Sequence, residues 1–199
     1  MAAVDLPNAA GVILWRDGGV SSGHHVCEYL LLQARYGGHW TPPKGHVDVK
    51  FGKKKKKKER ETAFRAALRE MKEETSIGES DVEICEETWI DAKYILPKPT
   101  RKVPTGQKVV RYFIGRLCSE EVKVCPQESE VSDFRWVKLD EALALVEYDE
   151  MQRVLRQAAA ILSDSSVSGN CSSSDEDSDS DGEIILLSMS RDLRANISL

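Results

Sequence analysis

The sequence predicts one folded α/β domain followed by a disordered acidic tail, and three observations support this fold class. Apolar runs typical of strands alternate with segments of helical periodicity along residues 1–162. Hydrophobic residues make up 41% of the 199 residues, which is enough for one core. Residues 163–182 are rich in Ser and acidic residues and contain no aromatic side chain, so they cannot offset the entropy lost on ordering. We therefore predict a domain over residues 1–162 and a Ser/Asp-rich disordered tail over residues 163–199.

The first part of the domain is predicted to contain two strands and a rigid loop. Residues 9–16 (AAGVILWR) and 29–34 (YLLLQA) are apolar runs joined by a polar, glycine-rich connection, which indicates two antiparallel strands. Residues 35–48 are rich in Gly and Pro, and two adjacent prolines restrict the backbone. We expect this segment to be ordered but to contain no helix or strand.

Residues 61–75 have the periodicity of an amphipathic helix. Phe64, Ala67, Leu68 and Met71 lie at i, i+3, i+4 and i+7, so they form one apolar stripe that should face a core.

Three more strands and a last helix complete the predicted domain. The strand-like runs are residues 82–90, 108–118 and 133–138. Residues 139–162 then predict one helix, with Asp140 as its N-cap.

The net charge of −5 is distributed unevenly. Residues 163–199 hold eight acidic and two basic residues, which leaves 26 basic and 25 acidic residues in the predicted domain. The domain is therefore close to neutral, and the overall acidity of the chain does not exclude an anionic ligand.

Cysteine usage and hydropathy predict a reduced intracellular protein. The five cysteines are scattered and lack C-x-x-C spacing, which argues against a disulfide framework and a zinc site. No apolar run approaches the roughly 20 residues of a membrane helix, and the N-terminus lacks the pattern of a secretory signal. We expect a cytoplasmic protein without a membrane partner, with a nuclear location left open.

Three glutamates of the predicted helix share one face. Glu70, Glu73 and Glu74 are neighbours at i, i+3 and i+4, where like charges repel. Nearby cationic side chains could balance them, but a divalent ion such as Mg²⁺, which prefers carboxylate oxygens, would do so better. The alternative is an ordinary solvated helix face.

The surrounding residues resemble the Nudix box, G-x5-E-x7-R-E-U-x-E-E-x-G-U, in which U is a bulky apolar residue. The matching residues are Glu61, Arg69, Glu70, Met71, Glu73, Glu74 and Ile77. The stretches LLLQA, HWTPPKGHVD, RYF, FRW and LDEA are similar to the diadenosine tetraphosphate hydrolase branch of the Nudix superfamily. The resemblance covers about residues 8–162 and implies an α/β/α sandwich with a mixed β-sheet.

The sequence departs from the Nudix box at two places. Ser76 stands where the box has its second glycine, which tolerates a positive φ at a helix end. Gly45 is the natural first glycine, but fifteen residues instead of five separate it from Glu61. The extra segment, about residues 49–60, contains six consecutive lysines. It is expected to be a solvated loop insertion; a functional basic arm, a nuclear-import or nucleic-acid patch and a gene-model error are the alternatives.

The resemblance implies a catalytic set made mainly of glutamates. Glu70, Glu73 and Glu74 match the family's metal ligands, with Glu70 also a candidate base, and Glu61 matches a supporting ligand. Arg69 resembles the family's structural arginine, which orients the glutamates through charge-assisted hydrogen bonds. The implied cofactor is Mg²⁺ or Mn²⁺.

A further loop glutamate is implied before the FRW stretch. Glu130 resembles the additional glutamate that serves as ligand or base in relatives. Glu128 is its rival, and an exposed loop acid without a role is the alternative for either residue.

The residues implied to bind substrate are Tyr36, His39, Lys44, Lys98, Lys102 and Tyr112. The two tyrosines match positions that stack adenine, and His39 and Lys44 match positions that meet the phosphate chain. Lys98 and Lys102 lie in a basic, Pro-rich loop that resembles the family's loop around the distal phosphates. Ordinary strand packing is the alternative for Tyr112, and a solvated turn is the alternative for the loop lysines.

The reaction implied by this branch is asymmetric hydrolysis of diadenosine tetraphosphate to ATP and AMP. The expected partner is a dinucleoside polyphosphate bound by a monomer, and nucleic acid is not expected although the lysines leave it open. The alternatives are a pyrophosphohydrolase of inositol pyrophosphates or RNA 5′ ends, because one fold serves many substrates, and a non-catalytic nucleotide-binding module.

Overall fold

A computed structural model describes residues 6–21, 24–51, 58–100, 103 and 106–167. Lys102, most of the lysine run and most of the predicted tail lie outside the described residues.

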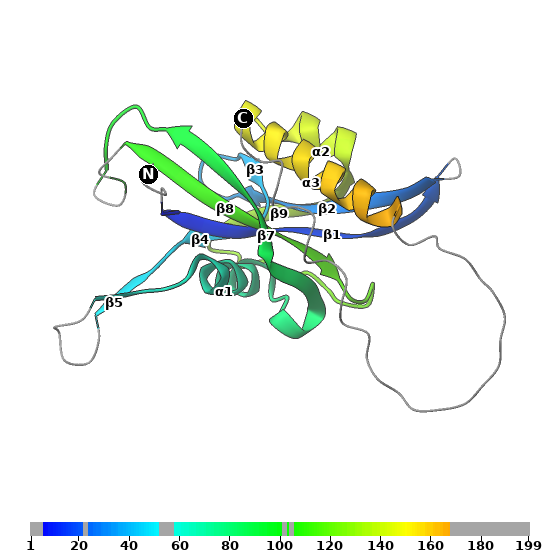
Figure 1. The fold of residues 1–199 in the computed structure, drawn as a ribbon, viewed down its shortest axis with the longest axis horizontal. Helices are drawn as coiled ribbons and strands as arrows, with labels where there is room; N and C mark the ends of the chain where they lie inside the picture. Colours follow the sequence, from blue (N-terminus) through cyan, green and yellow to red (C-terminus); the bar gives the residue numbers. More distant parts are fainter. Residues whose placement is uncertain (1–5, 22–23, 52–57, 101–102, 104–105, 168–199) are drawn as a thin grey trace. The chain divides into compact units, whose positions relative to one another are not determined.

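Seven strands of the described chain form one mixed sheet. Its order is β3-β2-β1-β8-β7, with β4 paired to β1 and β9 paired to β2. β1 and β8 run parallel, and the other pairs run antiparallel (Figure 1). The strands are β1 Ala9–Ser21, β2 His24–Ala34, β3 Trp40–Thr41, β4 Lys44–His46, β7 Val82–Ile95, β8 Gln107–Leu117 and β9 Val131–Lys138. All five predicted strands are therefore confirmed.

Helices cover both faces of the sheet. One face packs against α1 (Ala63–Thr75), and the other packs against α2 (Leu139–Leu145) and α3 (Asp149–Val167) (Figure 1). In β1, Ile13 points to the α2–α3 side while Val12 and Leu14 point to the α1 side, and all three are fully buried. A strand buried on both faces reads as a continuous apolar run. The predicted α/β/α sandwich with a mixed sheet is confirmed.

Helix α1 begins and ends with local signals. The Thr62 hydroxyl accepts a hydrogen bond from the Arg65 amide (3.2 Å) and caps the N-terminus. The helix ends at Ser76, whose φ of 64° is left-handed, as the glycine of the Nudix box led us to expect. The predicted apolar stripe is confirmed because Ala67, Leu68 and Met71 are buried.

The sequence predicts one last helix over residues 139–162, but the structure has two helices there, so this prediction is wrong. The backbone of Val146 is extended (φ −79°, ψ 130°), and this buried residue separates α2 from α3. The turn lets both short apolar faces pack on the same side of the sheet. Lys138, not Asp140, is the N-cap residue of α2, and α3 continues to Val167, past the boundary predicted at residue 162.

The segment predicted to be irregular, residues 35–48, contains two short strands. β3 pairs with β2, and β4 pairs with β1. The prolines between them do not interrupt this arrangement, because the Pro43 carbonyl accepts a hydrogen bond from the Val12 amide (3.0 Å). The turn between β3 and β4 is thereby held against the centre of the sheet.

The ends of the predicted insertion pair with each other. β5 (Val49–Phe51) and β6 (Lys58–Arg60) form a separate antiparallel ribbon. No helix within the described ranges has the length and apolarity needed to cross a membrane.

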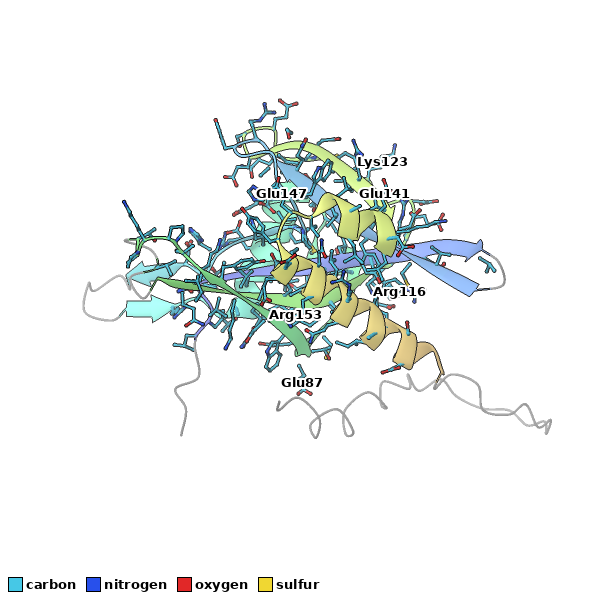
Figure 2. The ribbon with its side chains drawn as sticks, turned by 90° about the horizontal axis from the view of Figure 1, so that it is seen from above. Glu87, Arg116, Lys123, Glu141, Glu147 and Arg153 are labelled. Carbon is cyan, nitrogen blue, oxygen red and sulfur yellow. The ribbon has the colours of Figure 1, made fainter. Side chains whose placement is uncertain are left out.

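Glu150 and Arg153 connect α3 to strand β7. The Glu150 carboxylate accepts a hydrogen bond from the Lys93 amide (2.7 Å). Arg153, which is labelled on α3 in Figure 2, donates from Nη2 to the Asp91 carbonyl (2.7 Å). Arg153 also donates to Glu150 (Nε to Oε2, 2.8 Å), and this bond holds the pKa of Glu150 below its usual range.

We expect Glu150→Gln to lower the melting temperature at about pH 7 and to have a progressively smaller effect as the pH falls below the unfolded-state pKa of about 4.3. The pKa of Glu150 is lower in the folded than in the unfolded chain. The ionised carboxylate therefore stabilises the fold above the unfolded-state pKa, and this contribution is lost as the pH falls through the folded-state pKa. Thermal unfolding of both proteins across this range is the measurement. An equal loss at every pH would show that the charge of Glu150 is irrelevant.

Candidate active site

A cavity of about 630 Å³ opens between α1, the β3–β4 turn and the start of β9. It collects most of the predicted site residues, although they come from distant parts of the chain. The predicted residues that line it are Tyr36, His39, Lys44, Glu70, Glu73, Glu74 and Glu130. Its volume is in the range of small-molecule sites.

Arg69 organises the glutamates beside this cavity. Its Nε and Nη2 atoms donate to the two oxygens of Glu61 (3.2 and 3.0 Å), and Nη1 donates to Glu70 (2.8 Å) and Glu73 (3.1 Å). A bond from Nη2 to the His46 carbonyl (2.9 Å) fixes the guanidinium to the end of β4. Hydrogen bonding to Glu61 raises the pKa of Arg69 above its ordinary value. The planar guanidinium thus fixes the orientation of three carboxylates, those of Glu61, Glu70 and Glu73.

Glu74 is the most buried carboxylate of the cavity, at 9% exposure. Its Oε2 accepts a hydrogen bond from the Lys44 amide (2.8 Å), which links α1 to strand β4. Burial raises the pKa of Glu74 to about 7, although the charge and the amide of Lys44 oppose the shift. This carboxyl group can therefore gain or lose a proton close to neutral pH.

Gly45 is required for the close approach of Glu70. A Cβ atom at this position would lie 2.0 Å from the carboxyl carbon of Glu70 and 2.2 Å from each of its oxygens. Burial raises the pKa of Glu70, while the hydrogen bond from Arg69 opposes this. The first glycine of the Nudix box thus makes room for a functional carboxylate.

We expect Gly45→Ala to lower turnover by about tenfold with little change in the melting temperature, because the Glu70 carboxylate must move away from its position. The effect should act through Glu70. In a double-mutant cycle, Gly45→Ala should therefore cost little in a Glu70→Gln background. Turnover and thermal unfolding of the four proteins are the measurements. Additive losses in turnover would contradict this explanation.

Glu130 lies on a segment that is tied to both α1 and β2. The Glu130 carbonyl accepts from the Arg35 amide (2.8 Å), and the Gln127 amide donates to the Glu74 carbonyl (3.2 Å). Ser76 adds a bond from its hydroxyl to the Cys125 carbonyl (3.0 Å), which a glycine could not make. Glu130 lines the cavity whereas its rival Glu128 does not, so the geometry favours Glu130.

Aromatic and cationic side chains, Tyr36, His39 and Lys44, also line the cavity. His39 is half-buried, and burial together with the charges of Lys44 and Lys108 lowers its pKa, although Glu147 opposes the shift. The Tyr148 ring meets the His39 ring edge-to-face at 6.4 Å and is 53% exposed. Tyr36 is 82% exposed on the preceding turn. An anionic, ring-containing ligand would find both kinds of contact here.

Two neighbours of His39, Lys108 and Tyr148, do not line the cavity themselves and are missing from the residues predicted from sequence. Lys108 lies on β8 opposite Tyr94, and the Tyr94 ring is 6.0 Å from that of Tyr148. A predicted break between α2 and α3 would have been the signal for Tyr148, because it would have placed this tyrosine in a turn rather than inside a helix.

The structure does not support three of the predicted roles. Tyr112 is only 1% exposed, and its hydroxyl lies 3.4 Å from the Thr41 hydroxyl, so neither ring face is open to a base. Glu61 uses both oxygens to bind Arg69 and is not part of the cavity lining, so the structure places it beside the arginine and not among the carboxylates of the cavity. Lys98 is exposed on its loop and does not line the cavity.

The remaining carboxylates have the chemistry of a divalent-metal site. Glu70, Glu73, Glu74 and Glu130 offer only oxygen ligands in one cavity. Within the described ranges, no three His, Cys, Asp or Glu side chains are already gathered around a common metal position. Part of the reason is that Arg69 holds Glu70 and Glu73 from the side. Mg²⁺ usually takes one or two protein carboxylates together with water and phosphate, so the donors fit.

Comparisons with known proteins agree with these observations. The family model described as NUDIX domain matches residues 5–158. The bis(5′-nucleosyl)-tetraphosphatase (asymmetrical) of Rattus norvegicus is 34% identical over 157 residues, covering 77% of this chain and 94% of the relative. The enzyme of the same name from Caenorhabditis elegans is 34% identical over 159 residues, covering 77% and 95%.

Two further comparisons concern a solved structure and a differently named enzyme. The crystal structure of a C. elegans Ap4A hydrolase binary complex superposes with a TM-score of 0.61 at 32% identity, covering 78% of this chain and 97% of the other. An RNA pyrophosphohydrolase of Photorhabdus laumondii is 30% identical over 168 residues, covering 78% of this chain and 84% of the relative.

Proposed function

The chain belongs to the NUDIX domain family and is a Nudix hydrolase, and we propose that it cleaves diadenosine tetraphosphate asymmetrically into ATP and AMP. The observation that carries the proposal is that one cavity is lined both by four glutamates and by the cationic and aromatic side chains of Tyr36, His39 and Lys44. This substrate combines a polyphosphate chain with planar bases and would use both kinds of side chain. Relatives at 34% identity that are named for this activity support the choice.

We propose that Glu70, Glu73, Glu74 and Glu130 hold the divalent metal ion that Nudix hydrolases generally require, either Mg²⁺ or Mn²⁺. When bound, such an ion neutralises phosphate oxygens and lowers the pKa of a coordinated water. The protein's own contribution is orientation. Arg69 aims Glu70 and Glu73, and the Lys44 amide aims Glu74.

His39, Lys44 and two neighbours of His39, Lys108 and Tyr148, would hold the phosphate chain and one nucleobase. Lys44, Lys108 and His39 supply donors for phosphate oxygens, and the exposed ring of Tyr148 offers a stacking surface. When one nucleobase of the substrate is held at a fixed place, only one phosphoanhydride bond of its phosphate chain can reach the carboxylates. Cleavage at one fixed position of a four-phosphate chain explains asymmetric products.

A carboxylate must accept the proton of the attacking water. Glu130 is our first candidate because it is exposed at the cavity and no described side chain donates a hydrogen bond to its carboxylate. Glu70 is the second candidate, because one of its oxygens already accepts a hydrogen bond from Arg69.

The test is incubation of the purified chain with Mg²⁺ and diadenosine tetraphosphate, followed by separation of the nucleotides. ATP and AMP in equal amounts are the expected products. Two ADP molecules, or no cleavage, would reject the proposal.

A second candidate substrate is the 5′ end of RNA, because an RNA pyrophosphohydrolase is 30% identical over 78% of this chain. The same assay with 5′-triphosphorylated RNA and an inositol pyrophosphate ranks the three substrates. We expect the largest kcat/KM for diadenosine tetraphosphate.

We also expect the enzyme to work as a monomer in the cytoplasm or nucleus. Size-exclusion chromatography with light scattering tests the first expectation, and microscopy of a tagged protein tests the second.

A further inference from the structure

The lysine-rich insertion separates two residues that the site needs close together. Asp48 directly follows the β3–β4 segment, and Glu61 directly precedes the cap of α1. The residues between them are the part of this chain that departs most from the Nudix box. A long flexible connection would leave Glu61 free to move relative to Gly45 and His46.

The antiparallel ribbon closes this connection at its base. Val49 pairs with Arg60, Lys50 with Glu59 and Phe51 with Lys58. The ladder continues inward, because the Glu61 amide donates to the Asp48 carbonyl (2.9 Å). Hydrogen-bonded pairs alternate along an antiparallel ladder, so Lys50 and Glu59 form the next hydrogen-bonded pair beyond Asp48 and Glu61.

The base of the ribbon is held against β1 through Arg60 and is connected to the catalytic carboxylates through Glu61 and Arg69. The Asp48 amide donates to Glu61 Oε2 (3.3 Å), and the Arg60 guanidinium donates to the Pro7 carbonyl next to β1. Both oxygens of Glu61 then bind Arg69.

We propose that the ribbon β5–β6 is a positioning element, which holds Glu61 in place so that Arg69 can orient Glu70 and Glu73 despite the insertion. The residues beyond the Lys50–Glu59 pair are not needed for this task. This inference rests on the proposed function only where it assigns metal binding to Glu70 and Glu73. It concerns the backbone pairing of the ribbon, and the Arg60 side chain adds one contact to Pro7.

Two variants separate the ribbon from the segment beyond it. In the first variant, residues 51–58 are replaced by Asn-Gly, so that Lys50 and Glu59 close a two-residue turn. Asn-Gly is a favoured sequence for such a turn. The replacement also removes all six consecutive lysines. In the second, Lys50→Pro removes an amide that points into the ladder. Lys50→Gln controls for the lost charge, and Phe51→Pro controls for proline at a position whose amide points away from the partner strand.

Three readouts are compared: kcat and KM, Mn²⁺ affinity without substrate, and hydrogen exchange of the Glu61 amide. The Asn-Gly variant should keep all three within about twofold of the parent. Lys50→Pro should lower kcat and Mn²⁺ affinity by about tenfold, with a smaller change in KM, and should speed exchange at Glu61. Both control variants should behave like the parent.

Two outcomes would overturn the proposal. One is an Asn-Gly variant with tenfold lower Mn²⁺ affinity, which would mean that the removed residues support the site. The other is Lys50→Pro with unchanged exchange at Glu61 and unchanged Mn²⁺ affinity. If diadenosine tetraphosphate is not a substrate, Mn²⁺ affinity and hydrogen exchange still decide the role of the ribbon.

Discussion

Glu73→Gln should lower the turnover of diadenosine tetraphosphate by at least about 100-fold while leaving the melting temperature unchanged. A metal ligand supplies several kcal/mol of transition-state stabilisation, and each 1.4 kcal/mol corresponds to about a factor of ten in rate. The fold should tolerate the change because the Glu73 side chain is 52% exposed, and Arg69, to which it is bonded, keeps Glu61 and Glu70.

The matched control for this experiment is Glu141→Gln. Glu141 is an exposed glutamate on α2, on the opposite face of the sheet (Figure 2). It should leave both kcat/KM and Mn²⁺ affinity at the level of the parent. Should Glu73→Gln retain more than about a tenth of the turnover, Glu73 would have no place among the metal ligands.

Arg69→Met should reduce the free energy of unfolding by about 2 kcal/mol and also abolish most of the activity. The variant leaves the carboxylates of Glu61 and Glu70, which are 13% and 12% exposed, without their shared cation. The loss should be smaller than for a fully buried pair because the Arg69 side chain keeps 25% of its exposure. Urea unfolding at neutral pH measures the effect.

Two further variants test the reason for this loss. Arg65→Met removes an arginine of the same helix that is 68% exposed and lies 3.6 Å from Glu79, so it should change stability by less than about 0.5 kcal/mol. Arg69→Lys keeps the charge but not the planar fork and should therefore be intermediate. If Arg65→Met were as destabilising as Arg69→Met, the effect would not come from the glutamate network.

The main elements of the fold could be predicted from the sequence because their signals are local. The apolar stripe of α1 follows from a period of 3.6 residues, and the long strands follow from β-branched and apolar runs. Short strands were missed because β3 and β4 exist only through pairing with β1 and β2. The break at Val146 was missed because both flanking segments, 142–146 and 151–155, contain apolar residues typical of a helix.

The candidate site could be predicted in part. Glu70, Glu73 and Glu74 are neighbours on one helix, so their meeting follows from helix geometry alone. The substrate-binding role predicted for Tyr112 is not supported, because the sequence does not show whether an aromatic residue on a strand is buried in a central strand or exposed at an edge. β8 lies between β1 and β7, and its Tyr112 side faces the layer formed by α2 and α3.

The sequence by itself determined the helix that carries the carboxylates, the sandwich of strands and helices, and the family to which the chain belongs. These depend on spacings of a few residues, which the backbone converts directly into a shared face. Only the tertiary structure decided that Glu61 binds Arg69, that Lys108 and Tyr148 join His39, and that the ends of the insertion pair. His39, Lys108 and Tyr148 are far apart in the chain, Glu61 lies outside the helix that carries Arg69, and the ladder depends on how two strands align. Such contacts exist only once the sheet has set its order and register.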